Sequence, residues 1–339
     1  MTVLQQPDAF SFSAGMKDII ISSQDTVIFI LNIPSGIVLQ ETYTADAEGK
    51  IYIRDLGKLC QSYISPVTLR EQFTMKLLNV ETNAVFSTIN ITVQYSNVVL
   101  DISAEEFLED RFLSLLDREK IIYREQKEFL SLVVPAQTDV KAVIRRKSGV
   151  FENIHLTTIS QINTVITIDV SPSIFTNPET ITYYTILAGD RPMTYYIRPE
   201  PTPGVQFIFL NSFGVKETFI PSGLINHENK YENSFGTFAG KYRKYFIDFK
   251  KLFTANTGVI DDNHATWLEE LFMSKDVFLL SPSGIENEIT IEEATVKRTS
   301  AREELPAYEF KYRDTKINHY EFVTKRSRIF DETFNYTFN

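Results

Sequence analysis

The stretch that decides the fold runs from Val205 to Leu280: VQFIFLNSFGVKETFIPSGLINHENKYENSFGTFAGKYRKYFIDFKKLFTANTGVIDDNHATWLEELFMSKDVFLL. It begins with VQFIFL, turns at Asn211-Ser212-Phe213-Gly214 and returns through VKETFI. This pattern predicts a hairpin, because glycine tolerates the positive φ that a tight turn needs. A long polar loop should follow, then a strand in YRKYFIDFKKLFTANTG, a helix over Asn263–Met273 with the only Trp, and a buried strand in DVFLL.

The composition of the whole chain favours strands. Its 339 residues suggest about two domains of roughly 150 residues each. The chain has 26 Phe and 16 Tyr against one Trp, and Phe and Tyr fit a half-buried pleated surface. The sequence therefore predicts a mainly β protein, with two or more antiparallel sandwich-like or barrel-like domains and a few short helices.

Charge and cysteine content restrict the environment and the partners. A formal net charge of −10 disfavours non-specific binding to nucleic acid or to an anionic membrane. Cys60 is the only cysteine, so an intramolecular disulfide is impossible and folding in a reducing cytosol is expected. The first residues lack the basic start and apolar run of a signal peptide, and no window approaches the ~20 apolar residues of a membrane span.

The rest of the chain also shows strand patterns, which divide it into four parts. Residues 1–100 form an N-terminal β domain, 101–127 a helical connector, 128–324 one or more C-terminal β-rich domains, and 325–339 a C-terminal arm. Strands about 8–12 residues apart with turns between them are typical of a sandwich or barrel. Ser103-Ala104-Glu105-Glu106 has the form of a capping box and predicts a helix to about Leu116.

Several motifs are weak as evidence for chemistry. Gly236–Lys241 resembles a phosphate loop, but the glycine spacing is wrong and a flexible polar loop is expected instead. Asp261-Asp262-Asn263 lacks the glycine and distal Glu of a calcium loop, so an N-cap for the Trp267 helix is the better interpretation.

The titratable residues show no catalytic spacing. The four histidines (His155, His227, His264 and His319) lie far apart, and Cys60 has no histidine near it in sequence. The paired carboxylates Glu105/Glu106, Glu269/Glu270 and Glu303/Glu304 are expected to be solvated charges. We therefore assign no catalytic, cofactor-binding or metal-binding residue, and we expect neither a cofactor nor an enzymatic activity.

A basic cluster at Lys241–Lys251 carries five Lys and Arg against Asp248, with Tyr and Phe between them. Such interleaving is found on single-strand nucleic-acid binding faces. The simpler interpretation is a strand with its charged residues facing out and its aromatic residues facing in.

Four segments resemble proteins encoded in phages and prophages of Bacteroidota: ITYYTILAGDRPMTYYIRP, FIFLNSFGVKETF, FTANTGVIDDNHATWLEELFMSKDVFLL and LPAYEFKYR, together spanning roughly Thr180–Arg313. These proteins belong to the virion tail or baseplate and are similar to distal-tail or tail-tip components. The resemblance implies a β-rich subunit without a cofactor that assembles in rings in the host cytoplasm. Its partners would be copies of itself and other tail proteins.

Two other classes of function remain open from the residues. A carbohydrate-binding or adhesin module would use Tyr and Phe to stack on sugars, with a host-surface glycan as partner. A glycan-cleaving enzyme ranks last, because it needs two carboxyl groups about 5–9.5 Å apart across the sugar. Aromatic residues on alternating strands fit core packing as readily as ligand binding.

Overall fold

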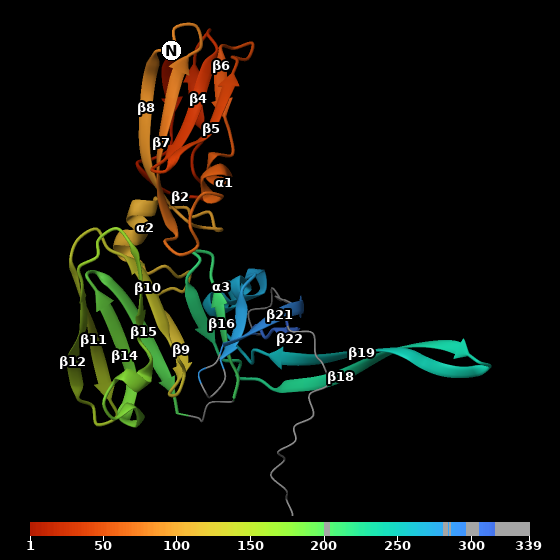
Figure 1. The fold of residues 1–339 in the computed structure, drawn as a ribbon. Coiled ribbons are helices and arrows are strands. Elements are labelled where there is room, and N and C mark those ends of the chain that lie inside the picture. Colours follow the sequence, from red (N-terminus) through yellow and green to blue (C-terminus); the bar gives the residue numbers. More distant parts are fainter. Residues whose placement is uncertain (200–203, 281–283, 285, 296–304, 316–339) are drawn as a thin grey trace, which may run out of the picture.

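The computed structural model describes residues 1–199, 204–280, 284, 286–295 and 305–315. It is mainly β, with 52% strand and 11% helix, which confirms the predicted fold class. Three blocks follow one another along the chain, and a long hairpin projects from the last one (Figure 1). The segment 325–339, which we predicted to be a C-terminal arm, lies outside the described residues and is not part of this hairpin.

The N-terminal block is a sandwich of two sheets. One sheet has the order β1-β3-β6 and the other β2-β8-β7-β4-β5, in which β2 pairs with β8 in parallel. Strict alternation along Val27–Ile33 and Arg70–Asn79 turns every second side chain into a core that includes Phe29, Phe73 and Met75. The strands are β1 Thr2–Gln5, β2 Phe10–Phe12, β3 Ile19–Ser22, β4 Val27–Ile33, β5 Gly36–Tyr43, β6 Lys50–Ile53, β7 Arg70–Asn79 and β8 Val85–Gln94.

Two short helices accompany this block. α1 (Leu56–Gln61) buries Cys60. α2 (Ala104–Asp110) begins at Ser103, whose side chain accepts a hydrogen bond from the Glu106 amide, as the capping-box pattern predicts. The helix ends at Asp110, so the prediction that it continues to Leu116 is wrong.

The helix ends earlier than predicted because the apolar residues that follow it pack in a different core. Phe112 and Leu116 pack in an extended segment, and β9 follows at Glu119–Tyr123. This strand lies within the charged run that we expected to belong to the connector.

The middle block is a second sandwich. A five-stranded sheet has the order β12-β11-β14-β15-β9, in which β9 joins β15 in parallel, and it faces the two-stranded sheet β10-β13. The remaining elements are β10 Phe129–Val133, β11 Thr138–Arg146, β12 Phe151–Ile159, β13 Val165–Asp169, β14 Ile181–Ala188, β15 Arg191–Arg198 and the 3-10 turns Pro172–Ile174 and Pro178–Thr180.

The C-terminal block is a seven-stranded sheet with the order β17-β16-β20-β21-β22-β19-β18. The predicted hairpin is confirmed as β16 (Gln206–Leu210) and β17 (Lys216–Phe219), with Gly214 at a φ of +76°. Helix α3 (Asp262–Met273) follows β18 (Ile225–Phe238) and β19 (Lys241–Asn256). The remaining strands are β20 Val277–Leu280, β21 Glu286–Thr295 and β22 Glu309–Asp314.

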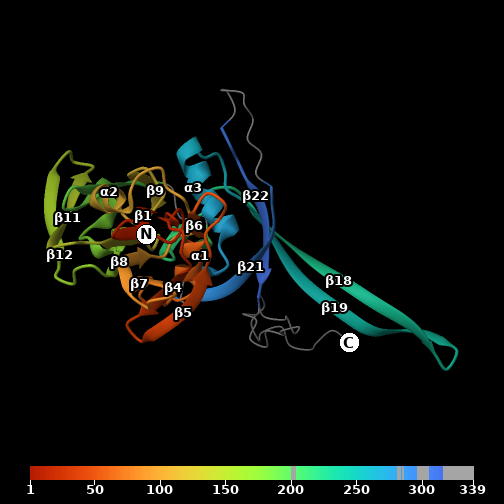
Figure 2. The ribbon, with the colours of Figure 1, turned by 90° about the horizontal axis from the view of Figure 1, so that it is seen from above.

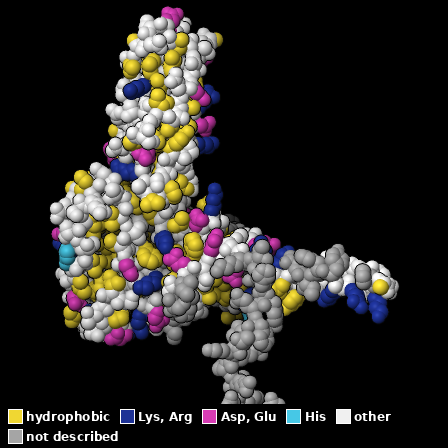
Figure 3. Space-filling view, viewed as in Figure 1, with side chains coloured by type: hydrophobic (Ala, Val, Ile, Leu, Met, Phe, Trp, Pro, Cys, Tyr) yellow, Lys and Arg dark blue, Asp and Glu magenta, His cyan; other side chains and the backbone are white. Residues whose placement is uncertain are grey.

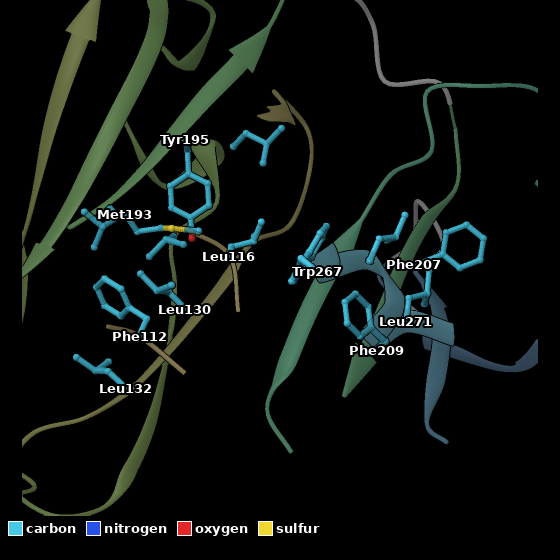
Figure 4. Packing of buried hydrophobic residues seen from close by; sticks show 14 of the residues in the cluster. Phe112, Leu116, Leu130, Leu132, Met193, Tyr195, Phe207, Phe209, Trp267 and Leu271 are labelled. Atoms are coloured by element: carbon cyan, nitrogen blue, oxygen red, sulfur yellow. The ribbon is translucent and has the colours of Figure 1, made fainter. Parts of the chain in front are cut away.

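The middle and C-terminal blocks share one continuous core. Figure 4 shows Leu130 and Tyr195 of the middle block on one side, and Phe209 and Trp267 of the C-terminal block on the other. Trp267 is 1% exposed and packs against Phe209, with Leu268 and Leu271 buried beside it, so the helix is docked through this residue.

The segment between β17 and β19 differs from the prediction. It was expected to be a long polar loop, but most of it is the 14-residue strand β18, paired along its whole length with β19. The expected loop Gly236–Lys241 is the end of this hairpin, whose turn lies at Ala239 and Gly240. Ile225 at its start packs on the core, but the following residues of β18, from Asn226 to Glu232, are exposed, so no apolar alternation was required there.

Candidate functional site

The hairpin of β18 and β19, residues 225–256, is the candidate functional site, and we call it the arm. Figures 1 and 2 show it extending away from the rest of the molecule in both views. Only the base of β19, from Phe253 to Asn256, pairs with a third strand, β22. Among the described residues, the part from Lys241 to Leu252 pairs with β18 alone, and at about 3.3 Å per residue it is about 40 Å long.

The geometry of the arm follows from its turn and one irregularity. Ala239 and Gly240 both have positive φ, 51° and 71°, which is the backbone of a two-residue hairpin turn that follows the twist of the strands. The register shifts between Ser234 and Phe235, so β19 holds one extra residue there. This bulge reverses the alternation in β19 beyond it and brings Tyr242 and Lys244 onto the same face as Phe249 and Phe253.

As a result, one face of the arm carries a row of aromatic rings, which we call the aromatic stripe. The rings form cross-strand pairs with centroids 6.4 Å apart at the base, 5.1 Å in the middle and 5.2 Å near the turn, where the planes differ by 6°. The stripe consists of His227, Tyr231 and Phe235 from β18 and Tyr242, Phe249 and Phe253 from β19.

The stripe is exposed. Tyr231, Phe235 and Tyr242 are 57%, 45% and 73% exposed. The expected alternation of charged and aromatic residues is therefore present, and Phe253 at the base packs on the core beside Tyr312. From Tyr231 to the turn the rings are exposed instead, which corrects the simpler interpretation for that part of the strand. Three ring pairs at 0.5–1.5 kcal/mol each contribute about 2–4 kcal/mol, so the arm outside the sheet is only marginally stable by itself.

Cations border the stripe and dominate the end of the arm. The Lys251 Nζ lies 4.9 Å from the centroid of the Phe253 ring, and the Lys244 Nζ 5.9 Å from that of Phe235. Lys241 and Arg243 add two exposed charges near the turn, and Figure 3 shows Lys and Arg gathered towards the end of the arm. A face of this kind can bind acidic and apolar groups together, through cation–carboxylate pairs and ring packing.

The arm is anchored on a body whose blocks are joined by buried polar contacts. Lys120 on β9 is 4% exposed, and its Nζ lies 2.9 Å from Glu128 Oε2 and donates to the Thr218 carbonyl at 2.7 Å. The same Nζ lies 4.9 Å from the centroid of the Trp267 ring, whose Nε1 donates to Glu217. Burial raises the pKa of Glu128, against the opposing effects of Lys120 and the hydrogen bond from Thr218.

A second junction joins the C-terminal block to the N-terminal block at the β16–β17 turn. The Ser212 amide donates to Glu270 Oε1 at 2.8 Å, and the Ser212 carbonyl accepts from the Asn97 amide of the N-terminal block at 2.7 Å. Phe213 packs against Phe12 and against Phe107 of α2. This turn therefore holds α3 and the N-terminal block together.

Glu270 is unusual within this junction. It is 2% exposed and its Oε2 has no hydrogen-bond partner. Burial, followed by the charge of Glu217, raises its pKa to about 8. The expectation that Glu269 and Glu270 are both solvated charges is wrong for Glu270, because it lies one helical turn from Trp267 on the buried face of α3. The three-residue spacing between Trp267 and Glu270 could therefore have predicted the burial of Glu270 from the sequence.

A small cavity of about 80 Å³ lies beside the start of α3, lined by residues that include Ser222, Asp261, His264 and Trp267. His264 Nδ1 lies 2.6 Å from Asp261 Oδ2, and the Asp261 side chain caps the helix by accepting from the His264 amide, which confirms the predicted N-cap. Burial opposes the ionisation of Asp261, but these hydrogen bonds lower its pKa overall.

This pair does not form a catalytic triad. His264 Nε2 is buried without a hydrogen-bond partner, while the Ser222 hydroxyl donates to the Thr257 carbonyl at 3.0 Å. No base is therefore in contact with a nucleophile at this cavity, and general-base activation of Ser222 has no geometric support.

The remaining sequence candidates are scattered. His155 is an exposed residue 3.7 Å from Asp139, and His227 belongs to the aromatic stripe. Burial raises the pKa of Cys60 to about 12, which makes the thiol a poor nucleophile. Glu105 and Glu106 lie in the first turn of α2, whereas His319, Glu303 and Glu304 lie outside the described residues.

The described residues contain neither a cluster of metal ligands nor a helix that could span a membrane. In the described ranges, no three His, Cys, Asp or Glu side chains come together in a way that could hold a metal ion. The helices of those same ranges are too short and too polar to cross a bilayer.

Comparison with known proteins gives no family. No protein-family model matches the chain, and no curated protein matches it. Two structures of the full extracellular region of plexin A4 align with 92% of this chain at 8% identity and a TM-score of 0.20. The chain covers 39% and 31% of those two chains, and a likeness of this size carries no argument about function.

Proposed function

We propose that this chain is a structural subunit of a phage tail or baseplate that works through contacts between subunits and carries out no catalysis. In this proposal it assembles in the host cytoplasm, resides in the virion, and has copies of itself and other tail proteins as partners. The observation that carries the proposal is the arm, a projection about 40 Å long with exposed rings along one face.

The exposure of the arm supports an assembly role on energetic grounds. Folded monomers rarely leave a contiguous row of large apolar groups in water unless the surface binds something. The opposite face of the same hairpin carries an exposed ion pair, with Lys250 and Glu232 at 3.4 Å. The two faces therefore differ as expected for a hairpin that is covered on one side by a neighbour.

The body supports the same role by its rigidity. Buried ion pairs and hydrogen bonds at Lys120 and Ser212 fix the blocks relative to one another, so a force applied to the arm is transmitted to the whole subunit. The resemblance of Thr180–Arg313 to tail proteins of Bacteroidota phages is the reason for proposing a phage tail as the particle. Ring-forming subunits require one surface to meet a different surface on the next copy.

The test is to locate the protein in particles. Antibodies against the purified chain should label the tail or its end by immunogold electron microscopy of phage induced from the strain that encodes it. Unlabelled particles would refute the proposal. If the purified chain also bound or cleaved a host-surface polysaccharide, the adhesin or the glycan-cleaving class would replace it.

A further inference from the structure

We infer that the aromatic stripe of the arm binds the acidic surface of a second copy of this chain. This inference rests on the proposed function and goes beyond it by naming the two surfaces that meet. The stripe is the largest exposed aromatic feature among the described residues. Its occupant is indicated by how charge is divided along the chain.

The charge division is strong. The arm, residues 225–256, carries six Lys and Arg against three Asp and Glu, a balance of +3. Because the whole chain carries −10, the remainder carries −13. Between Asn233 and Ile247 the arm holds Lys241, Arg243 and Lys244 and no acidic residue. The end of the arm of one copy is therefore attracted to almost any part of the body of another.

The same charge division disfavours nucleic acid as the occupant. A strand of phosphates would meet three cations at the end of the arm and a body of −13 behind it. Single-strand binding grooves instead track the backbone with cations over several nucleotides. An acidic protein surface fits better, because its carboxylates can pair with Lys241, Arg243 and Lys244 while its apolar groups cover the rings.

The size of the arm sets the strength of the contact. Two strands about 4.8 Å apart and about 40 Å long present a face of roughly 400 Å², so covering it buries about 800 Å² over both partners. That is below the ~1,200–2,000 Å² of a stable pair. A single contact should therefore be weak, with a Kd in the micromolar range, and should become stable when a closed ring gives each copy two contacts.

The experiment is sedimentation velocity of the full chain from about 0.1 to about 50 μM, a range that brackets a micromolar Kd. The wild-type chain should pass from monomer to larger species across this range. Raising the salt to about 1 M, where the Debye length is about 3 Å, should shift the midpoint to higher concentration.

Two arm variants test the surface itself. The charge reversal K241E/R243E/K244E and the ring variant F235S/Y242S should each raise the midpoint at least tenfold. The matched control K58E/K76E/K141E makes the same change in net charge on exposed lysines of the other two blocks. It should not raise the midpoint, because a more acidic body attracts the arm at least as strongly. Unchanged circular dichroism of the arm variants shows that the body remains folded.

The outcomes separate this inference from the proposed function. If the chain assembles and the arm variants assemble equally well, the arm is not the interface, although a structural role stands. If the chain stays monomeric throughout and labels no phage particles, both proposals fail. Binding of a fluorescent oligothymidine that the charge reversal abolishes would reassign the arm to nucleic acid and overturn the inference.

Discussion

Replacing Glu270 with Gln should remove a large pH dependence from the stability of the protein. The pKa of Glu270 is raised from 4.5 to about 8 in the folded chain, chiefly by burial. Between these two pH values the folded state keeps a proton that the unfolded state has released. The free energy of unfolding therefore falls as the pH rises: the stability is fully present below about pH 4.5 and lost by about pH 8. At 1.36 kcal/mol per pKa unit, the loss is about 4–5 kcal/mol.

The substitution suits this test because Gln keeps the oxygen that accepts from the Ser212 amide and cannot ionise. Urea unfolding can be followed by the fluorescence of Trp267, the only Trp, which is buried on the same helix. At about pH 5 the two proteins should differ by less than about 1 kcal/mol, and at about pH 8.5 the variant should be more stable by about 3–5 kcal/mol.

The control is Glu288→Gln, which removes an exposed carboxyl from β21. It should change the free energy of unfolding by less than about 0.5 kcal/mol at either pH. Other buried acids, such as Glu128, contribute equally to the wild type and to both variants, so they cancel in the comparison. Parallel pH profiles for the wild type and Glu270→Gln would show that Glu270 ionises normally in the folded state, and the reasoning from its burial would be wrong.

Three further substitutions probe the joints between blocks. Lys120→Met should cost about 3–5 kcal/mol in urea unfolding by leaving Glu128 buried and unpaired, while the double variant Lys120→Met/Glu128→Leu should recover most of that loss; a double variant as unstable as the single one would contradict this. Trp267→Phe keeps an aromatic ring but removes the donor to Glu217, and should cost about 1–3 kcal/mol by thermal melting followed by circular dichroism; a melting temperature equal to that of the wild type would mean that this hydrogen bond contributes nothing. Gly214→Ala places a Cβ on a backbone with a φ of +76°, 2.7 Å from Leu69 Cδ2. It should cost about 1–3 kcal/mol in the same melting assay. An unchanged melting temperature would refute this expectation.

Strands that face a core could be predicted from the sequence, because burial on one face selects alternating apolar residues and burial on both faces selects a continuous apolar run. Val27–Ile33 and Gln206–Leu210 pack against other layers, and their apolar residues occupy the positions that burial requires. The turn at Asn211–Gly214 was equally clear, since its glycine occupies a positive φ. Helix α3 was found for a related reason, because its polar N-cap precedes an apolar face of helical period.

The elements that were missed do not follow this rule. β18 has no core on either side, so residues such as Asn226, Glu228 and Asn229 gave a loop-like pattern although they form a long strand. β9 was hidden because Lys120, which is buried by pairing with Glu128, looks like a surface residue in sequence. In both cases the local pattern lacks apolar periodicity: β18 is held by its backbone pairing with β19, and the burial of Lys120 depends on Glu128 and on Thr218 of β17.

Buried charged side chains and exposed aromatic rings occupy different parts of this molecule. Charged side chains such as Lys120, Glu128 and Glu270 are buried where blocks meet, whereas the rings of Tyr231 and Tyr242 are exposed on the arm. This reverses the usual distribution, in which charges remain in water and large apolar groups remain inside. Buried polar pairs require defined geometry and so fix the orientation of the blocks, and exposed rings gain stability only when another surface covers them. In the assembly proposed above, stiff joints matter because a contact made by the arm would set the position of the entire body.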